Sequence, residues 1–490
     1  MGTQAIRRKS SLMRPARLVF VAPLLVAACA LRPTPEAPPV LELIADQPAF
    51  VALDGPSSAL DPAAFEAWWD TIGGAELSEL IEVLDAENLD LSGARARTDQ
   101  ARARSRQALS GRLPAVGLSV EAGERRGVGP TGPLDWEETY AATAGLTWDL
   151  DLFGGTRNAQ LAARLRFEAQ KLGERTLFQV LTAETTTGFV RAWTLTRQIE
   201  VTEASVDSFA ETARLTDLRY RAGSPSVTAL DVQLARQNEA AARAALPELR
   251  AALVLQLQGL DVLLGRPIGT TRLSFTAPPD VTRLASLGVG VPADLLRRRP
   301  DVAAAELAYL AALADVGAAR AQLLPSLTLS GSLGQQTGDA SALFDPDQMI
   351  ASLVAGIAAP LYQGGRLRAQ VDLAEASARE LASAYANAAL RAIGEVEAAL
   401  VLEAAYEDEL ALRWRALEAA QISNRIAQER YASGQAPLLA VLEAQRALNA
   451  ARLDLVLAEQ KRLEARIDLF LALGGDWRMA ETIEGAVSHD

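Results

Sequence analysis

The stretch at residues 324–366, LPSLTLSGSLGQQTGDASALFDPDQMIASLVAGIAAPLYQGGR, alternates between apolar and polar side chains on either side of a turn-rich loop. Apolar residues occupy alternate positions at Leu327, Leu329 and Leu333, and the same step of two resumes from Ala351. Alternation with a period of two around a loop rich in Gly, Asp and Pro predicts a β-hairpin with one apolar face.

The same pattern occurs earlier in the chain, at residues 113–157. Leu113-Pro114 lies 211 residues before Leu324-Pro325, and Leu89-Asp90-Leu91 precedes Pro300-Asp301-Val302 by the same distance. A nearly constant offset over most of the chain indicates an internal duplication. We therefore expect two copies of one module.

Long proline-free stretches between the hairpins predict helices. The expected helices cover 76–112, 156–222, 226–264, 301–322 and 366–433, followed by one that ends near 473. A helix of 67 residues would be about 100 Å long, too long for an ordinary globular domain and typical of a coiled coil. Pro247 lies inside one of these helices and is expected to kink or split it.

The N-terminus has the features of an export signal. Five basic residues precede an apolar run at 18–28, which is followed by Cys29. The run is short compared with the ~20 residues that a membrane-spanning helix needs, so a signal peptide is the better interpretation. Val26-Ala27-Ala28-Cys29 resembles a bacterial lipobox, which predicts cleavage before Cys29 and its lipidation. The alternative is an ordinary signal with an incidental cysteine.

Composition excludes several classes of function. The 490-residue chain has one cysteine, one histidine (His489) and a formal charge of −13. Cys–His or Ser–His catalysis and histidine-based zinc sites therefore have almost no residues to use, and we expect no enzyme activity, no metal and no cofactor. The acidic balance argues against nucleic acid as a partner.

The sequence is expected to divide into six segments. They are a signal peptide at 1–28, a lipidated Pro-rich tether at 29–64, repeat 1 at 65–266, a linker at 267–299, repeat 2 at 300–477 and a tail at 478–490. The four strands are expected at about 113–126, 138–152, 324–336 and 349–361.

Each strand is long enough to cross a bilayer when tilted, since 12 residues extend about 40 Å. Four strands cannot close a barrel, however, and open strand edges are not tolerated in lipid. Strands in a membrane would therefore require several copies of the chain. The alternative is a soluble sandwich, which the very long helices make less favourable.

The mature chain resembles the outer-membrane efflux protein family of the TolC/OprM type, in the lipoprotein branch of the RND efflux outer-membrane factors. The matching motifs are Trp68-Trp69, Leu89-Asp90-Leu91, Trp148-Asp149-Leu150-Asp151-Leu152-Phe153-Gly154, Asp294-Leu295-Leu296-Arg297-Arg298-Arg299-Pro300-Asp301, Leu323-Leu324-Pro325-Ser326-Leu327 and Arg430-Tyr431-Ala432-Ser433-Gly434.

The resemblance implies an α+β membrane protein. A long antiparallel coiled-coil α-barrel would join a trimeric 12-stranded β-barrel with four strands per chain. The implied function is a passive exit duct in the outer membrane, serving an inner-membrane pump of the RND type through a periplasmic adaptor. The alternatives are a conduit for type I protein secretion and a periplasmic coiled-coil scaffold that forms no pore.

The resemblance also places the working residues near two Tyr-x-x-Gly turns, which are expected to dock the adaptor. The turn residues are Tyr220, Gly223, Tyr431 and Gly434. The candidates for polar links or acidic rings of a gate are Asp217, Arg219, Arg221, Asp231, Arg425, Arg430 and Glu443. For each charged residue the alternative is a solvated helix face, and the tyrosines can equally be packing residues.

Overall fold

The structure is a computed structural model. It describes residues 32–36, 38–39, 41, 49–52, 65, 67–128, 132, 134–275, 279, 281, 290, 292, 298–343 and 345–475. The expected signal peptide, Cys29 and the expected tail at 478–490 lie outside these residues. The chain divides into two compact units, of which one (1–36, 103–164 and 310–380) contains the sheet and the other (37–102, 165–309 and 381–490) is helical.

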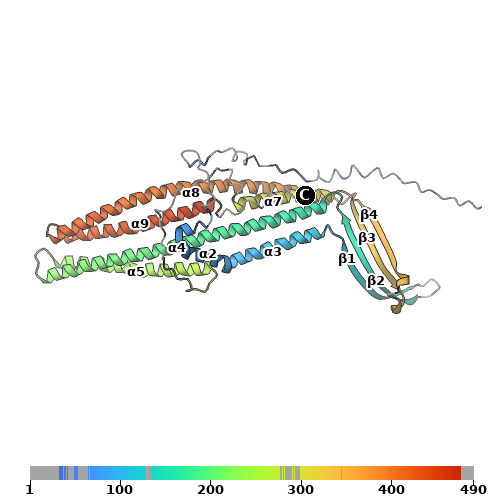
Figure 1. Ribbon diagram of the computed structural model, residues 1–490, viewed down its shortest axis with the longest axis horizontal. Helices are drawn as coiled ribbons and strands as arrows, with labels where there is room; N and C mark the ends of the chain where they lie inside the picture. The colour runs from blue at the N-terminus through green and yellow to red at the C-terminus, as the bar shows by residue number, and fades with distance from the viewer. Residues whose placement is uncertain are drawn as a thin grey trace, which may run out of the picture. The chain divides into compact units, whose positions relative to one another are not determined.

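The sheet has four antiparallel strands in the order β1-β2-β3-β4 (Figure 1). Their bounds are Ala115–Val128 for β1, Leu134–Leu150 for β2, Ser326–Thr337 for β3 and Ile350–Ala358 for β4. Both hairpins therefore form, and β2 pairs with β3, which joins the two copies in one sheet.

The strand bounds differ from the expected ones by a few residues. β1 begins two residues late because Leu113 and Pro114 belong to the turn after the preceding helix, and proline has no N–H to donate to a ladder. β4 ends at Ala358 rather than 361, shortly before Pro360. The predicted alternation is confirmed by the register, which places Leu327 opposite Ile357 and Leu329 opposite Ala355.

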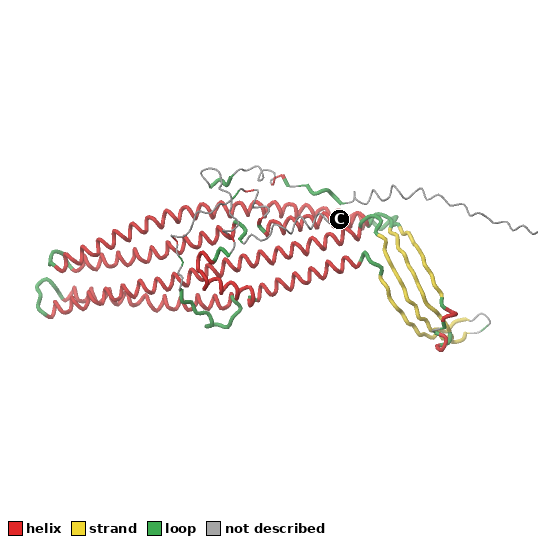
Figure 2. Tube along the Cα trace, viewed as in Figure 1, coloured by secondary structure: helices red, strands yellow, loops and turns green. Residues whose placement is uncertain are grey.

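The helices repeat the same plan twice (Figure 2). In repeat 1 they are α2 (Asp70–Glu87), α3 (Leu89–Ser110), α4 (Gly155–Arg221) and α5 (Ala229–Leu263). In repeat 2 they are α7 (Pro300–Ala321), α8 (Arg366–Ala432) and α9 (Leu438–Ala472). The long helices α4 and α8 each have 67 residues, and α5 and α9 each have 35.

One expectation about the helices was wrong. The helix expected over 76–112 is interrupted at Asn88, whose backbone is extended (ψ 128°). The Asn88 side chain accepts a hydrogen bond from the amide of Leu91 (2.7 Å), so it caps the start of α3. Pro247 does not split its helix, because α5 continues through it.

The main core of the helical unit joins both repeats. Phe189 and Trp193 of α4 contribute to it, as do Ile467 and Phe470 of α9. Trp68 stacks on Phe470 with ring centroids 4.9 Å apart. Trp68 of the Trp68-Trp69 motif is therefore a packing anchor of this core.

A short N-terminal segment, residues 49–52, is fastened to the same core. Phe50 is buried in it, and the backbone amides of Val51 and Ala52 donate to the two carboxylate oxygens of Glu397 on α8 (2.6 and 2.8 Å). A carboxylate that accepts two adjacent backbone amides makes charge-assisted hydrogen bonds. This contact holds the segment on the helical unit.

Among the described helices, α7 alone is long and apolar enough to cross a membrane. More than half of its most apolar window is buried inside the protein. A buried, alanine-rich helix in a helical core can be equally long and apolar, so these features alone do not indicate that α7 spans a membrane.

Candidate functional site

The two Tyr-x-x-Gly turns have the same backbone geometry. Gly223 and Gly434 both have positive φ angles, of 76° and 77°. In each turn the glycine N–H donates to the tyrosine carbonyl oxygen, and the next residue donates to the carbonyl of the residue before the tyrosine. These two bonds define a Schellman motif, in which a glycine at C′ ends a helix. Figure 2 shows both turns as loops between paired helices.

The turns differ in length. Residues 222–228 connect α4 to α5, whereas only residues 433–437 connect α8 to α9. Helices α5 and α9 therefore begin 209 residues apart, not 211, and Asp231 corresponds to Ala440 rather than to Glu443. The two acidic gate candidates occupy non-equivalent positions.

Asp231 has a structural role at the start of α5. Its carboxylate accepts hydrogen bonds from the backbone amide (2.8 Å) and the hydroxyl (2.7 Å) of Thr228, and its own amide donates to the Thr228 hydroxyl oxygen. This reciprocal arrangement is a capping box, which satisfies amides that the first helical turn leaves without partners. Helix α9 begins at Pro437 without a side-chain cap.

Asp217 connects the two helices of repeat 1. Its carboxylate lies 2.8 Å from Nε of Arg221 on the same helix and 3.1 Å from Nη2 of Arg236 on α5. Both arginines are largely exposed, and exposed ion pairs stabilise a protein by ~0–1 kcal/mol each. The expected polar link at Asp217 thus forms within repeat 1.

Arg219 and Tyr431 connect the two repeats near their turns. The guanidinium carbon of Arg219 lies 4.9 Å from the centroid of the Tyr431 ring, a cation–π distance. Tyr431 packs against a small apolar cluster that includes Phe209 and Leu442. Its counterpart Tyr220 is 46% exposed. The two tyrosines therefore differ in environment, and Tyr431 contacts the other repeat.

Three of the predicted site residues are not brought into contact. The side chains of Arg425, Arg430 and Glu443 are exposed and form no ion pair with any described residue. Within one chain, the structure therefore gathers Asp217, Arg219 and Tyr431 at the turns and leaves these three in solvent.

The sheet has chemically different faces. Cross-strand pairing puts Val116, Leu146, Gly331 and Leu353 in one row of one face, and Leu118, Ala144, Leu333 and Ala351 in the next. The opposite face is mainly polar, apart from Ile350 and Val354, and carries the hydrogen-bonded pairs Ser332–Ser352 (2.7 Å) and Thr328–Asp149 (2.6 Å). Alternation of this kind is typical of transmembrane β-barrels.

Aromatic residues bound the apolar face. Trp148 and Tyr140 lie on it, eight residues apart on β2. That separation corresponds to about 27 Å along the strand, or roughly 21 Å along the axis of a barrel with a ~40° tilt, which is comparable with the ~25 Å apolar band of outer-membrane barrels. Strands β1 and β4 are the edges of the sheet, and the outer side of each pairs with no described strand.

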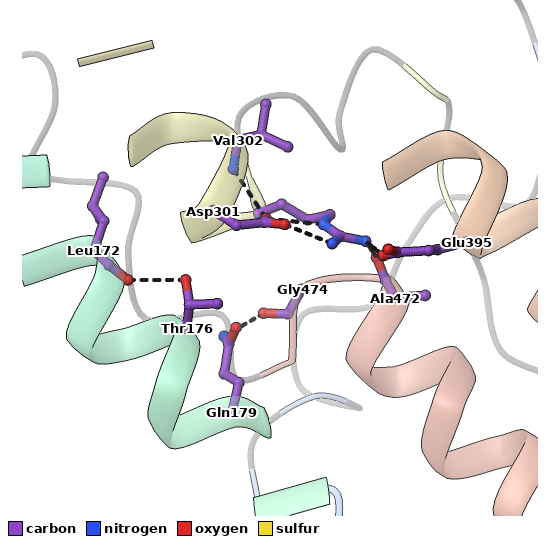
Figure 3. A network of polar contacts seen from close by, with 9 residues as sticks. Leu172, Thr176, Gln179, Asp301, Val302, Glu395, Ala472 and Gly474 are labelled. Carbon is purple, nitrogen blue, oxygen red and sulfur yellow. Dashed lines mark hydrogen bonds and ion pairs between the residues drawn. The ribbon is translucent and has the colours of Figure 1, made fainter. Parts of the chain in front are cut away.

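Buried ion networks hold the last helix of repeat 2. Arg299, just before α7, makes a bidentate contact with Asp301 and also donates to Glu395 and to the carbonyl oxygen of Ala472 (Figure 3). Burial works to lower the pKa of Arg299, but the bonds to Asp301 and Glu395 outweigh it and raise the pKa. The bonds of Arg299 thus tie α7, α8 and the end of α9 together.

A second network lies deeper between α8 and α9. The buried Arg462 and Arg466 both contact Glu403, at 2.8 Å for Arg462. Burial lowers the pKa of Arg466 despite the neighbouring carboxylate. The sequence prediction did not include Glu403 or these two arginines. Arg299 and Asp301 belong to one of the matching motifs, but Glu395 and Ala472, the other partners of Arg299, are far away in the sequence.

A single sheet with one apolar face, joined to duplicated pairs of very long helices, defines the class of outer-membrane channels that continue into a helical segment. The model of the outer membrane efflux protein family matches residues 80–266 and 291–475, so the chain belongs to that family.

The most similar relatives include the pyoverdine export outer membrane protein OpmQ of Pseudomonas putida. The chain is 32% identical to it over 421 residues, which cover 84% of this chain and 88% of the relative. It is 30% identical to the toluene efflux pump outer membrane protein TtgI of the same species, over 82% of this chain and 86% of that protein.

Among solved structures, the outer-membrane channel OprN matches with a TM-score of 0.78 and 28% identity, over 88% of this chain and 99% of that one. The predictions of the fold class, of the family and of an outer-membrane efflux channel are therefore confirmed. The family is one of channels rather than of enzymes.

Proposed function

We propose that the chain assembles as a homotrimer whose sheets close one 12-stranded barrel in the outer membrane. The main support is the sheet itself, which has an apolar face and two unpaired edge strands, β1 and β4. In lipid such edges need partners, and the β4 edge of one copy is the only strand that the β1 edge of the next can meet in a closed ring. The polar face of the sheet then lines the lumen.

The helix pairs of three copies form the periplasmic part of this duct. A periplasmic adaptor binds the Tyr-x-x-Gly turns, at Tyr220 and Gly223 of repeat 1 and at Tyr431 and Gly434 of repeat 2. An inner-membrane pump of the RND type supplies the energy. The duct itself moves substrate passively.

The substrate is set by the pump. Relatives with about the same similarity to this chain are named for pyoverdine export and for toluene efflux. Such different cargoes, carried by channels of one family, support a duct that accepts what its pump delivers.

A gate lies at the turns. The Arg219–Tyr431 contact links repeat 1 to repeat 2, and Asp217 fixes Arg221 and Arg236 beside it. Movement of α8 and α9 away from α4 would break the first contact and leave the second intact. Within one chain, Asp231 caps α5, and the other three gate candidates, Arg425, Arg430 and Glu443, lie in solvent. Any part that these four residues have in the gate is therefore a contact with another copy or with the adaptor.

Cys29 anchors the chain to the outer membrane through lipid. It lies outside the described residues, and the support is its lipobox-like sequence at the end of a signal peptide. Replacing Cys29 with Ser is expected to abolish palmitate labelling. Labelling that persists in the variant would overturn this assignment.

Single-channel recording in planar bilayers tests the duct. Purified protein is expected to run as a detergent-soluble trimer and to conduct ions, and a scaffold without a pore would give no conductance. Arg219→Ala is expected to raise the conductance, because it removes the contact between the repeats. Arg415→Ala is the matched control, since that exposed arginine makes no ion pair with a described residue of the chain.

Complementation distinguishes the duct from a protein-secretion conduit, which shares the fold. The gene is expected to restore drug or solvent resistance to a strain that keeps an RND pump and adaptor but lacks their outer-membrane channel. Restored secretion of a protein substrate, without restored resistance, would favour the conduit.

A further inference from the structure

A polar layer interrupts the apolar packing of α9, a short distance from the turns. Gln445 of α9 is only 5% exposed. Toward the turn, Leu442 belongs to an apolar cluster with Phe209 of α4. Away from the turn, Leu448 belongs to another apolar cluster with Leu417 of α8. A buried glutamine of α9 therefore lies between two apolar clusters, one shared with α4 and the other with α8.

The side-chain amide of Gln445 fixes α9 against α4. Its Nε2 lies 3.0 Å from Oγ of Ser208 and 2.9 Å from Oγ1 of Thr212. The Thr212 hydroxyl donates its own proton to the carbonyl oxygen of Ser208 (3.0 Å), which leaves its oxygen free to accept from Gln445. These bonds form only when α9 has one particular register along α4.

Helix α8 carries another amide side chain with a buried oxygen near its turn, that of Asn424. Asn424 lies seven residues after Leu417 and seven before Tyr431, so the three share one heptad position. Asn449 follows Gln445 by one helical turn. We call Asn424, Gln445 and Asn449 the Gln445 layer.

The layer contains buried oxygens without donors. Oδ1 of Asn424, Oε1 of Gln445 and Oδ1 of Asn449 are buried and accept no hydrogen bond from a described residue. A buried acceptor without a donor destabilises the state that buries it. The N–H groups of the Gln445 amide thus hold the packed helices in register, whereas the buried amide oxygens destabilise the same packed arrangement.

We propose that the Gln445 layer is where the α8–α9 pair separates from α4 when the channel opens, with Gln445 as the positioning residue. Its N–H groups set the packed register. Separation lets water reach the three oxygens, which lowers the free energy of the open arrangement relative to the packed one. A polar residue at a single core position of a coiled coil specifies register at a cost in stability, which is the combination that a reversible gate needs. This inference rests on the proposed gate at the turns.

The test compares Gln445→Leu with the unchanged protein, reconstituted as the full chain in planar bilayers. Gln445→Leu is expected to raise the thermal unfolding midpoint and to lower the open probability at least severalfold. Gln445→Asn keeps an amide that is too short for both α4 hydroxyls, and it is expected to restore the open probability without the gain in stability.

Gln179→Leu is the matched control. Gln179 is also buried (8% exposed) and donates to a carbonyl, that of Gly474 (Figure 3), but it lies outside the layer. Its substitution is expected to leave the open probability unchanged.

Three results would overturn the inference: an unchanged open probability in Gln445→Leu, an equal decrease in Gln179→Leu, or no recovery in Gln445→Asn. If Gln445→Leu fails to fold, Asn424→Leu carries the same expectations and the same contrary outcomes. Absence of conductance in the unchanged protein would instead refute the duct.

Discussion

The two repeats of this chain share a backbone plan but stabilise it with different side chains. Helices α4 and α8 have the same length, as do α5 and α9, and both turns are Schellman motifs. In repeat 1, Asn88 at the start of α3 donates to the carbonyl oxygen of Leu263 at the end of α5 (2.7 Å). The residue 211 positions later, Arg299, donates to the carbonyl oxygen of Ala472 at the end of α9.

The helix pairs differ more strongly along their length. Between α8 and α9, ion pairs follow one another as Arg413–Asp454, Lys461–Glu409, Arg462–Glu407 and Arg466–Glu403. Between α4 and α5, the described ion pairs are Arg236–Asp217 and Arg250–Glu203, all with exposed arginines. The duplicated geometry therefore does not require duplicated chemistry, and repeat 2 has the pair that is tied together at more points.

The largest effect is expected from a substitution in the buried ion network between α8 and α9, which repeat 1 lacks among its described ion pairs. Glu403→Gln removes the carboxylate that contacts both buried arginines, Arg462 and Arg466, and removing one partner of a buried ion pair costs about 3–5 kcal/mol. Glu203→Gln, which removes the exposed partner of Arg250, is expected to cost ~1 kcal/mol or less. Denaturant unfolding followed by circular dichroism measures both. Equal costs would mean that the buried network does not distinguish the repeats.

The next prediction concerns the turn geometry that the two repeats share. Gly223 and Gly434 have nearly equal positive φ angles, and a Cβ added at either would meet no atom within 4 Å. Alanine is therefore expected to destabilise both turns by about the same amount, roughly 1–2 kcal/mol, from the left-handed conformation alone. The unfolding free energies of the two variants are the measurement, and a cost at only one turn would contradict the shared geometry.

A smaller effect is expected at the helix starts. Thr228→Ala removes the capping box of α5 and is expected to cost ~1 kcal/mol, whereas Thr228→Ser keeps the capping hydroxyl and should cost little. Hydrogen exchange of the first amides of α5 reports the loss locally. The first amides of α9, which has no side-chain cap, are expected to exchange unchanged in both variants.

The smallest expected effect depends on pH. Glu306 of α7 corresponds to Arg95 in repeat 1, which pairs with Asp85 (2.5 Å). Burial raises the pKa of Glu306 above its ordinary value of 4.5, so its protonated form is favoured in the folded protein. That contribution to stability is present below pH 4.5 and is lost as the pH rises through the raised pKa.

Glu306→Gln is therefore expected to match the unchanged protein at acidic pH and to unfold at a higher temperature at neutral pH. Thermal melts across this pH range test the expectation. Glu380→Gln, at an exposed position of α8, is the control. A constant difference at every pH would show that burial of the Glu306 charge is not the cause.

Patterns that repeat along the chain were readable from the sequence. Period-two alternation located four strands, proline-free stretches located α4 and α8, and the offset of 211 revealed the two repeats. The break at Asn88 was missed because it depends on one side chain capping α3. The contacts of Arg299 with Glu395 and of Arg462 and Arg466 with Glu403 were missed because these partners come from distant segments that only the packed helices bring together.

The site was less predictable than the fold. Charges near the turns were identified, but sequence spacing did not show that Asp231 would bond to Thr228 or that Arg219 would lie over Tyr431. The two-residue difference between the turns also hid which acids correspond. Gln445 carried no signal in the sequence, because its importance comes from two apolar clusters whose residues belong to four different helices.

The unpaired edges β1 and β4 have a genetic consequence in the proposed ring. A copy whose β4 edge is blocked, for instance by a proline at a position that must donate to its neighbour, still offers a normal β1 edge. It can therefore join normal copies without allowing the ring to close. Produced alongside the normal protein, such a copy would withdraw normal subunits into defective assemblies and act dominantly, whereas loss of the whole chain would be recessive.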